Sequence, residues 1–179
     1  MNRRTFISIG SLLLFSRYSL AKAFRTFYSS KNQTAIIGVG SAGVSVLKNP
    51  KLQIKSLVAY DKDVAMKNIQ ALNKYKQVVL VSGLASISSN AYCLDMIQRL
   101  KNQGFAVSWF CFQPFSFEGK SKQEIALETI KQAKDMKVQF RPLDLNSLQK
   151  YYGNMTIKKA LQKADDLLVN QICYMVKKV

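Results

Sequence analysis

An almost unbroken apolar run, Phe105 to Phe112, constrains the fold more than any other part of this sequence. Such a run, rich in aromatic residues and ended here by Pro114, is typical of a strand that is covered on both faces. Parallel sheets need that double cover. Residues 121–124, SKQE, have the pattern of a capping box, which predicts the start of a helix. The segment therefore predicts a buried strand, a short loop and a helix.

Strand-like and helix-like segments alternate along the rest of the chain. Short apolar runs predict strands at residues 35–37, 54–60, 77–81 and 138–140. Helical spacing predicts helices near residues 44–48, 65–72, 93–100 and 126–133, with Gly104 as a stop signal. Thr156 caps the longest predicted helix, whose apolar face is Ile157, Leu161, Ala164, Leu168, Ile172 and Met175. This order predicts a three-layer α/β fold with a mainly parallel, Rossmann-like sheet and a long final helix.

Composition suits a single basic domain. The 179 residues, 48% hydrophobic, fit one globular unit, which we place at residues 35–179. Lys and Arg outnumber Asp and Glu by 27 to 10, for a formal charge of +17. An acidic protein or an anionic surface fits this charge as a partner; the alternative is that the lysines only face water. Cys93, Cys111 and Cys173 lack metal-ligand spacing and no His is present, so we expect buried thiols and no metal site.

The first 23 residues have the pattern of an export signal, and residues 24–34 form a linker. Paired arginines precede an apolar run that is too short to span a bilayer, and a small-x-small pattern follows. The motif resembles the twin-arginine signal, which implies an exported, periplasmic protein without a transmembrane span in the mature chain. Its residues are Arg3, Arg4, Phe6, Ala21 and Ala23. The alternatives are a basic extension on a membrane surface, a wrongly assigned start codon, and a cytoplasmic protein.

A glycine-rich turn follows the first predicted strand. Gly38, Gly40 and Gly43 have the GxGxxG spacing that lets backbone N–H groups and a helix N-terminus receive a phosphate. With Asp61 near the end of the second predicted strand, this spacing fits a Rossmann dinucleotide site. The alternative is that the glycines let a helix pack closely on the strand. Because no recognisable proton-transfer or nucleophilic arrangement accompanies the turn, we predict no catalytic residues.

Five segments, in order, resemble FtsZ, the bacterial tubulin homologue of cell division. They are IGVGSAG at residues 37–43, VAYD at 58–61, VLVSG at 79–83, PFSFEG at 114–119 and ALQKADDLL at 160–168. The resemblance spans roughly residues 35–176 and implies an FtsZ/tubulin-type N-terminal domain. It also implies a GTP or GDP site which, where retained, is formed by Gly38, Gly40, Ser41, Gly43, Asp61, Gly83, Ser88, Ser89 and Asp165.

The sequence departs from FtsZ where that family binds phosphate and hydrolyses GTP. In place of the family's GGGTGTG loop stand residues 85–91, ASISSNA, and Ile87 is a steric obstacle there. The residues after it, Ser88 to Asn90, either cap the next helix or donate to a ligand. The segment with the family's γ-phosphate loop is missing after Asp61, and the sequence stops before the family's catalytic loop and second domain. Asp165 and Asp166 have an alternative as solvated residues of an amphipathic helix.

These observations predict a degenerate, non-enzymatic binding or scaffold module that no longer hydrolyses GTP and holds no cofactor. A protein or an anionic surface is the expected partner, and assembly with itself or with an FtsZ-like protein is a further expectation. One alternative is a cytoplasmic GTP-binding protein that partners or modulates FtsZ; another is a Rossmann-type binder of a dinucleotide or other anion. Nucleic acid is not expected, because Trp109, Phe110 and Phe112 lie in a predicted core strand.

Overall fold

Four parallel strands form one sheet in the part of the chain that the structure describes. The computed structural model describes residues 34–52, 72, 75–153 and 155–178. The strands lie side by side in chain order: β1 (Thr34–Val39), β2 (Gln77–Gly83), β3 (Ala106–Gln113) and β4 (Gln139–Asp144). Every neighbouring pair is parallel, which confirms the predicted α/β fold. The predicted strand 54–60 and most of helix 65–72 lie outside the described residues, although Leu72 is buried in the core.

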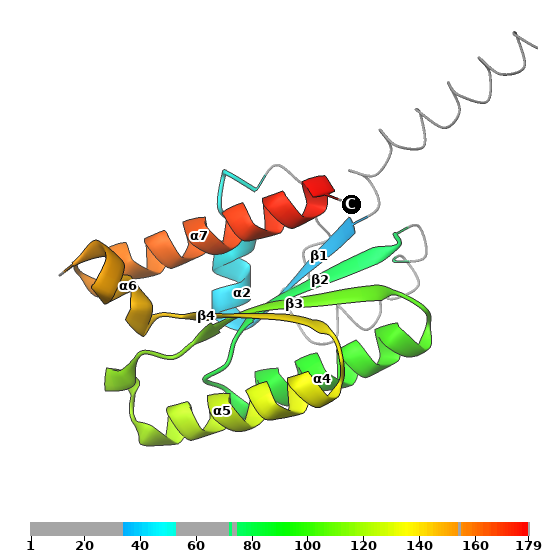
Figure 1. The fold of residues 1–179 in the computed structure, drawn as a ribbon, viewed down its shortest axis with the longest axis horizontal. Helices are drawn as coiled ribbons and strands as arrows, with labels where there is room; N and C mark the ends of the chain where they lie inside the picture. The colour runs from blue at the N-terminus through cyan, green and yellow to red at the C-terminus, as the bar shows by residue number, and fades with distance from the viewer. Residues whose placement is uncertain (1–33, 53–71, 73–74, 154, 179) are drawn as a thin grey trace, which may run out of the picture.

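Helices cover both faces of the sheet and complete the three predicted layers (Figure 1). On one face lie α2 (Gly40–Leu47) and α7 (Ile157–Lys178), and on the other lie α4 (Ile87–Asn102) and α5 (Lys120–Asp135). Two short elements, η3 (Ser116–Glu118) and α6 (Asn146–Tyr152), follow the carboxyl ends of β3 and β4. Within these ranges, no helix is long and apolar enough to cross a bilayer.

The core lies on both sides of the sheet because successive side chains of a strand point to opposite faces. In β2, Val78 and Leu80 pack towards α4, whereas Val79 and Val81 pack towards α7. Trp109 of β3 is fully buried, and its indole N–H donates to Ser82 Oγ at 2.9 Å. The predicted core roles of Val107, Trp109 and Phe112 are confirmed, since all three are buried.

Two helix starts differ from the prediction. Helix α5 begins at Lys120 after Gly119, whose φ is +106°, so Ser121 lies inside the helix and the predicted capping box is wrong. Helix α4 begins at Ile87, earlier than the predicted helix near residues 93–100, and only three residues separate it from β2. Its cap is Ser86, and Ser88 to Asn90 lie within the helix instead of capping it. The Ser86 hydrogen bond sets the start of α4, where the sequence offered more than one serine, whereas α5 starts after the positive φ of Gly119 without a side-chain cap.

Two other starts have clear physical causes. Thr156 caps α7 as predicted, because its Oγ1 accepts the N–H of Lys159 at 3.4 Å. The sequence did not predict α6, a short helix of seven residues. It starts where the Asp144 carboxylate accepts the N–H of Asn146 at 2.9 Å, a local turn that has no apolar periodicity.

Candidate functional site

A cavity of about 550 Å³ lies at the carboxyl ends of β1, β2 and β3. The N-terminal ends of α2 and α4 form one side of it, and Ala164 and Asp165 of α7 form another. Crevices at the carboxyl ends of parallel strands are the usual ligand sites of open α/β sheets. We therefore treat this cavity as the candidate site.

The glycine-rich segment serves packing and the cavity at once. Helix α2 begins at Gly40 rather than at Val44, so the segment forms its first turn, and the φ of Gly40 is +69°. A Cβ on Gly43 would lie 2.2 Å from the carbonyl oxygen of Val81, and one on Gly38 would lie 2.7 Å from the carbonyl oxygen of Gly43. These two glycines let α2 approach the sheet, whereas Gly40 and Ser41 line the cavity.

The start of α4 lies against the start of α2. A Cβ added to Gly40 would be 3.4 Å from Ser89 Oγ, so the two helix N-termini meet at the cavity. Gly83 and Ser89 line the cavity as well. Ser88 does not; its hydroxyl lies 3.2 Å from Ser86 Oγ. Helix N-termini favour anions, because their first N–H groups are unpaired and the helix dipole is positive there.

The two aspartates of α7 hold the helix to α2 and the turn after it. Asp165 Oδ2 accepts the hydroxyl of Ser45 at 2.5 Å, and Asp166 accepts from Asn49 at 2.8 Å and from Lys51 at 2.6 Å. Both side chains are half-buried, in contrast to the solvated alternative. Burial raises the pKa of Asp165 against the opposing effect of the Ser45 hydrogen bond, whereas the bonds from Lys51 and Asn49 lower the pKa of Asp166.

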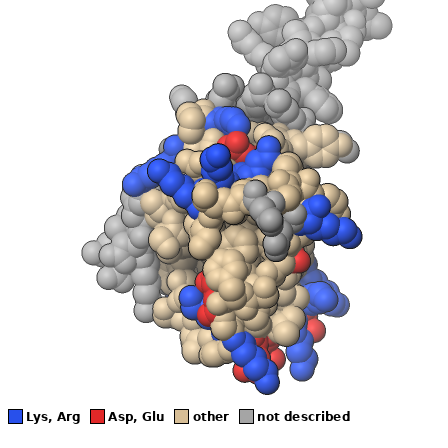
Figure 2. All heavy atoms as spheres, turned by 90° about the vertical axis from the view of Figure 1, so that its left-hand side faces the viewer, with Lys and Arg blue, Asp and Glu red and all other residues tan. Residues whose placement is uncertain are grey.

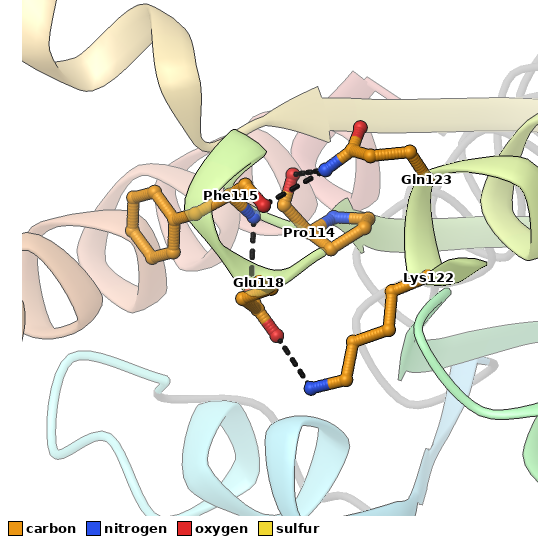
Figure 3. A network of polar contacts seen from close by, with 5 residues as sticks. All are labelled: Pro114, Phe115, Glu118, Lys122 and Gln123. Atoms are coloured by element: carbon orange, nitrogen blue, oxygen red, sulfur yellow. Dashed lines mark hydrogen bonds and ion pairs between the residues drawn. The ribbon is translucent and has the colours of Figure 1, made fainter. Parts of the chain in front are cut away.

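The segment from Pro114 to Gln123 forms a polar network at the cavity rim (Figure 3). The Glu118 carboxylate accepts the N–H of Phe115 at 2.9 Å and pairs with Lys122 at 3.1 Å. Gln123 Nε2 donates to the carbonyl oxygens of Pro114 (3.0 Å) and Phe115 (2.8 Å). Because Glu118 and Lys122 line the cavity, they belong with the candidate site. Sequence reasoning assigned them no role, although their i, i+4 spacing directly after a buried strand is a usable signal.

Six of the predicted site residues fall outside the part of the chain that the structure describes. Asp61 lies outside the described residues, as do Arg3, Arg4, Phe6, Ala21 and Ala23 of the export signal. Among the residues described, no three His, Cys, Asp or Glu side chains gather to hold a metal ion. Cys93 and Cys111 are buried as predicted, and Cys173 is half-buried. Burial raises the pKa of Cys93 to about 12 and that of Cys111 well above its ordinary value, so neither is a ready thiolate.

Comparison with known proteins finds likeness in structure alone. No protein-family model matches the chain, and no curated protein matches it in sequence. Among solved structures, an empty FtsZ dimer from M. jannaschii superposes with a TM-score of 0.71 at 15% identity, over 89% of this chain and 58% of that one. A protofilament of CetZ2 from Haloferax volcanii bound to GTPgS gives 0.63 at 13% identity, over 81% and 58%. A TubZ protofilament from bacteriophage PhiKZ gives 0.52 at 10% identity, over 79% and 56%.

The chain thus spans less than two thirds of the length of these proteins. Their shared architecture is the one described above, a parallel sheet between helix layers. Identity this low shows the fold and nothing finer. The described part of this chain has the fold of the FtsZ, CetZ and TubZ structures.

Proposed function

We propose that this chain is a non-enzymatic binding or scaffold module built on the FtsZ/tubulin fold, one that binds no GTP tightly and hydrolyses none. The observation that carries the proposal is the start of α4. There the Ser86 hydroxyl oxygen accepts a hydrogen bond from the N–H of Ser89 at 3.4 Å. The side chain of Ile87, in the first turn, is 69% exposed. A phosphate at this helix end would have to displace the Ser86 hydroxyl from the Ser89 N–H, whereas Ile87, the obstacle predicted from the sequence, does not line the cavity.

Calorimetric titration of the purified chain with GTP and Mg²⁺, together with a phosphate-release assay, tests this proposal. We expect no saturable heat in the micromolar range and no phosphate release above the protein-free rate. Replacing Ser86 by Ala, which frees the Ser89 N–H, should then improve GTP affinity more than Thr156→Ala, which removes the corresponding cap of α7. Saturable micromolar binding by the unmodified chain would overturn the proposal.

A second candidate is a cytoplasmic guanine-nucleotide-binding partner or modulator of FtsZ. The cavity favours it, because Gly40, Ser41 and Ser89 bring two helix N-termini to one side and Asp165 stands on the other. If this candidate holds, Asp165→Asn weakens binding of GTP and leaves that of ATP unchanged, while Asp95→Asn on the far part of α4 changes neither. Co-sedimentation with FtsZ filaments would then depend on GTP binding.

A third candidate is a Rossmann-type dinucleotide or anion binder, supported only by the turn from Gly38 to Gly43. Cofactor absorbance in the freshly purified chain would favour it over the other two. Its absence, after slow purification at low salt, would remove the candidate.

Export remains a proposal that the N-terminal motif supports. N-terminal sequencing of the native protein is its sharpest test, since cleavage after Ala23 places the mature chain outside the cytoplasm. Replacing both Arg3 and Arg4 by Lys should then block processing. Uncleaved native protein would favour the cytoplasmic candidate instead.

A further inference from the structure

Exposed apolar side chains concentrate at one end of the molecule, near the carboxyl ends of the strands. Phe117 of η3 is 65% exposed, Tyr151 of α6 is 72% exposed and Ile157 of α7 is 57% exposed. They are neighbours, since Phe117 and Ile157 line the same small cavity and Lys163 of α7 lies 4.7 Å above the ring of Tyr152. We call this surface the basic corner; its residues are Phe117, Lys150, Tyr151, Tyr152, Ile157, Lys158, Lys159, Leu161 and Lys163.

The segment that carries most of the basic corner, from α6 to the first turns of α7, has only positive charge, and Asp165 and Asp166 follow it in α7. Between Leu145 and Ala164 the sequence has four lysines and no acidic residue. Within the described part of the chain, no carboxylate forms an ion pair with Lys150, Lys158 or Lys159. Figure 2 shows this end of the molecule, where blue side chains, with red ones among them, lie around uncharged residues in the upper part of the face. Such a surface attracts an anionic partner.

Internal packing does not explain the placement of these residues. Lys158 and Lys159 stand in the first turn of α7, which has no acidic residue, and positive charge there opposes the helix dipole. The apolar stripe of α7 is buried at Leu168 and Ile172, but Ile157 and Leu161 remain exposed. At the start of α7, the lysines oppose the helix dipole and the exposed apolar side chains contact water, and both effects are unfavourable. An environment that is anionic and also apolar would relieve both.

Composition distinguishes among the possible partners. The cavity between Phe117 and Ile157 is about 210 Å³, smaller than the roughly 300–1,000 Å³ of small-molecule sites. Protein interfaces are depleted in Lys. Single-stranded nucleic acid could stack on the exposed rings of Phe117, Tyr151 and Tyr152, but it does not account for the exposure of Ile157 and Leu161. Lysines beside exposed Tyr, Phe and Ile are the composition of surfaces that lie in a membrane interface.

We propose that the basic corner binds an anionic lipid membrane, with Phe117, Ile157 and Leu161 entering the interface and the lysines contacting the headgroups. The two tyrosines suit the boundary between the headgroups and the acyl chains. The lysines that contact the headgroups do not line the cavity at the strand ends, whereas Leu161 belongs to both surfaces.

Vesicle flotation tests the lysines. The full chain is compared on vesicles of phosphatidylcholine with phosphatidylserine and on phosphatidylcholine alone. We expect salt-sensitive binding only to the vesicles that contain phosphatidylserine. Each lysine removed should lower the affinity about fivefold, so Lys150→Gln, Lys158→Gln and Lys159→Gln together should lower it on the order of a hundredfold. The matched control is Lys76→Gln, Lys131→Gln and Lys134→Gln, which removes the same charge from exposed positions outside the corner and should cost much less. Both triple variants keep the same first 33 residues, so any contribution of these residues to vesicle binding cancels when the two variants are compared.

Tryptophan reporters test the apolar contact. Phe117→Trp and Leu127→Trp place an indole at sites of nearly equal exposure, 65% and 64%, inside and outside the corner. The native Trp109 is fully buried and gives a constant background. When phosphatidylserine vesicles are added, the tryptophan fluorescence emission should shift to the blue in Phe117→Trp but not in Leu127→Trp.

Three results would overturn the proposal. They are absence of binding to phosphatidylserine vesicles, equal loss in the two triple variants, and equal spectral shifts in the two reporters. Binding of a single-stranded oligonucleotide that is lost in the corner variant, without vesicle binding, would assign the surface to nucleic acid instead.

Discussion

Among the glycines that the structure describes, Gly43 has the least room for a side chain. It lies in α2, where Ala would ordinarily be preferred over Gly by about 1 kcal/mol. Its added Cβ would however lie 2.2 Å from the Val81 carbonyl oxygen, so helix and strand must separate. We predict that Gly43→Ala lowers the free energy of unfolding by about 3 kcal/mol or more, as measured by urea denaturation.

Gly104 is the matched control for this substitution. Its φ is +83° and an added Cβ would meet nothing within 4 Å, so Gly104→Ala carries backbone strain alone, about 1–2 kcal/mol. Equal losses from the two variants would contradict the packing role of Gly43. The GxGxxG spacing could not separate packing from ligand binding, because both need the same absence of a Cβ.

Asn90 is a buried polar residue whose role the sequence did not indicate. It is 3% exposed, and its Nδ2 donates to the Leu84 carbonyl oxygen at 3.0 Å and to Thr129 Oγ1 at 2.8 Å. These bonds join α4 to α5 and to the end of β2. We predict that Asn90→Ala costs about 1–3 kcal/mol of unfolding free energy, since it leaves the Leu84 carbonyl buried and unpaired. Asn102→Ala, at the exposed end of α4, should stay within about 0.5 kcal/mol, and a similar cost at both sites would refute this role.

At the scale of elements, the sequence predicted the helices and strands that periodicity governs and the Thr156 cap of α7, but it did not predict where α4 and α5 begin. The apolar runs of β1, β2 and β3 and the stripe of α7 each repeat over several residues, and the structure confirms these elements. Helix α5 starts after Gly119 without a side-chain cap, and the bonds of Glu118 and Gln123 hold the preceding loop. Such contacts depend on rotamers that residue spacing does not specify.

The contact between α2 and α7 predicts opposite effects of two neighbouring carboxylates. The pKa of Asp166 is lowered, so its bonds to Lys51 and Asn49 stabilise the fold above the unfolded pKa of about 3.9 and are lost as pH falls through the lower folded value. The pKa of Asp165 is raised by burial, so its ionised form destabilises the fold at neutral pH and this cost disappears as pH falls through the raised value.

We therefore predict that Asp166→Asn lowers the free energy of unfolding at pH 7 by about 0.2–1 kcal/mol. Asp165→Asn should leave it unchanged or raise it, because an amide oxygen still accepts the Ser45 hydroxyl. Urea unfolding at pH 7, and again at a pH below the folded pKa of Asp166, measures the change in unfolding free energy of both variants. The loss of stability in Asp166→Asn should vanish at the lower pH. A destabilised Asp165→Asn at pH 7 would contradict the assigned pKa shift.

At the scale of the whole molecule, the order of strands and helices was enough to predict a parallel sheet in three layers. Parallel connections need helical crossovers, so the alternation leaves few other topologies. The cavity was only partly predictable. The glycines and serines at the ends of β1 and β2 stood out, but Glu118 and Lys122 join them only because β3 lies next to β2 in the sheet. The exposure of Ile157 was not predictable either, since the spacing of an apolar stripe does not tell where the sheet beneath it ends.

The buried cysteines offer a readout of global stability. Cys93 of α4 and Cys111 of β3 are fully buried in the core between the sheet and α4, and burial raises the pKa of Cys93 to about 12. In a Cys173→Ser variant, we predict that a thiol reagent labels Cys93 and Cys111 at the same rate. This rate should depend on urea concentration as global unfolding does, because the reagent reaches neither thiol unless α4 separates from β3. Measurement at several urea concentrations, with single Cys93→Ser and Cys111→Ser variants added to the same background, separates the two rates. If Cys93 reacted faster than Cys111, α4 would open on its own, and the layer of α4 on the sheet would be less stable than the sheet itself.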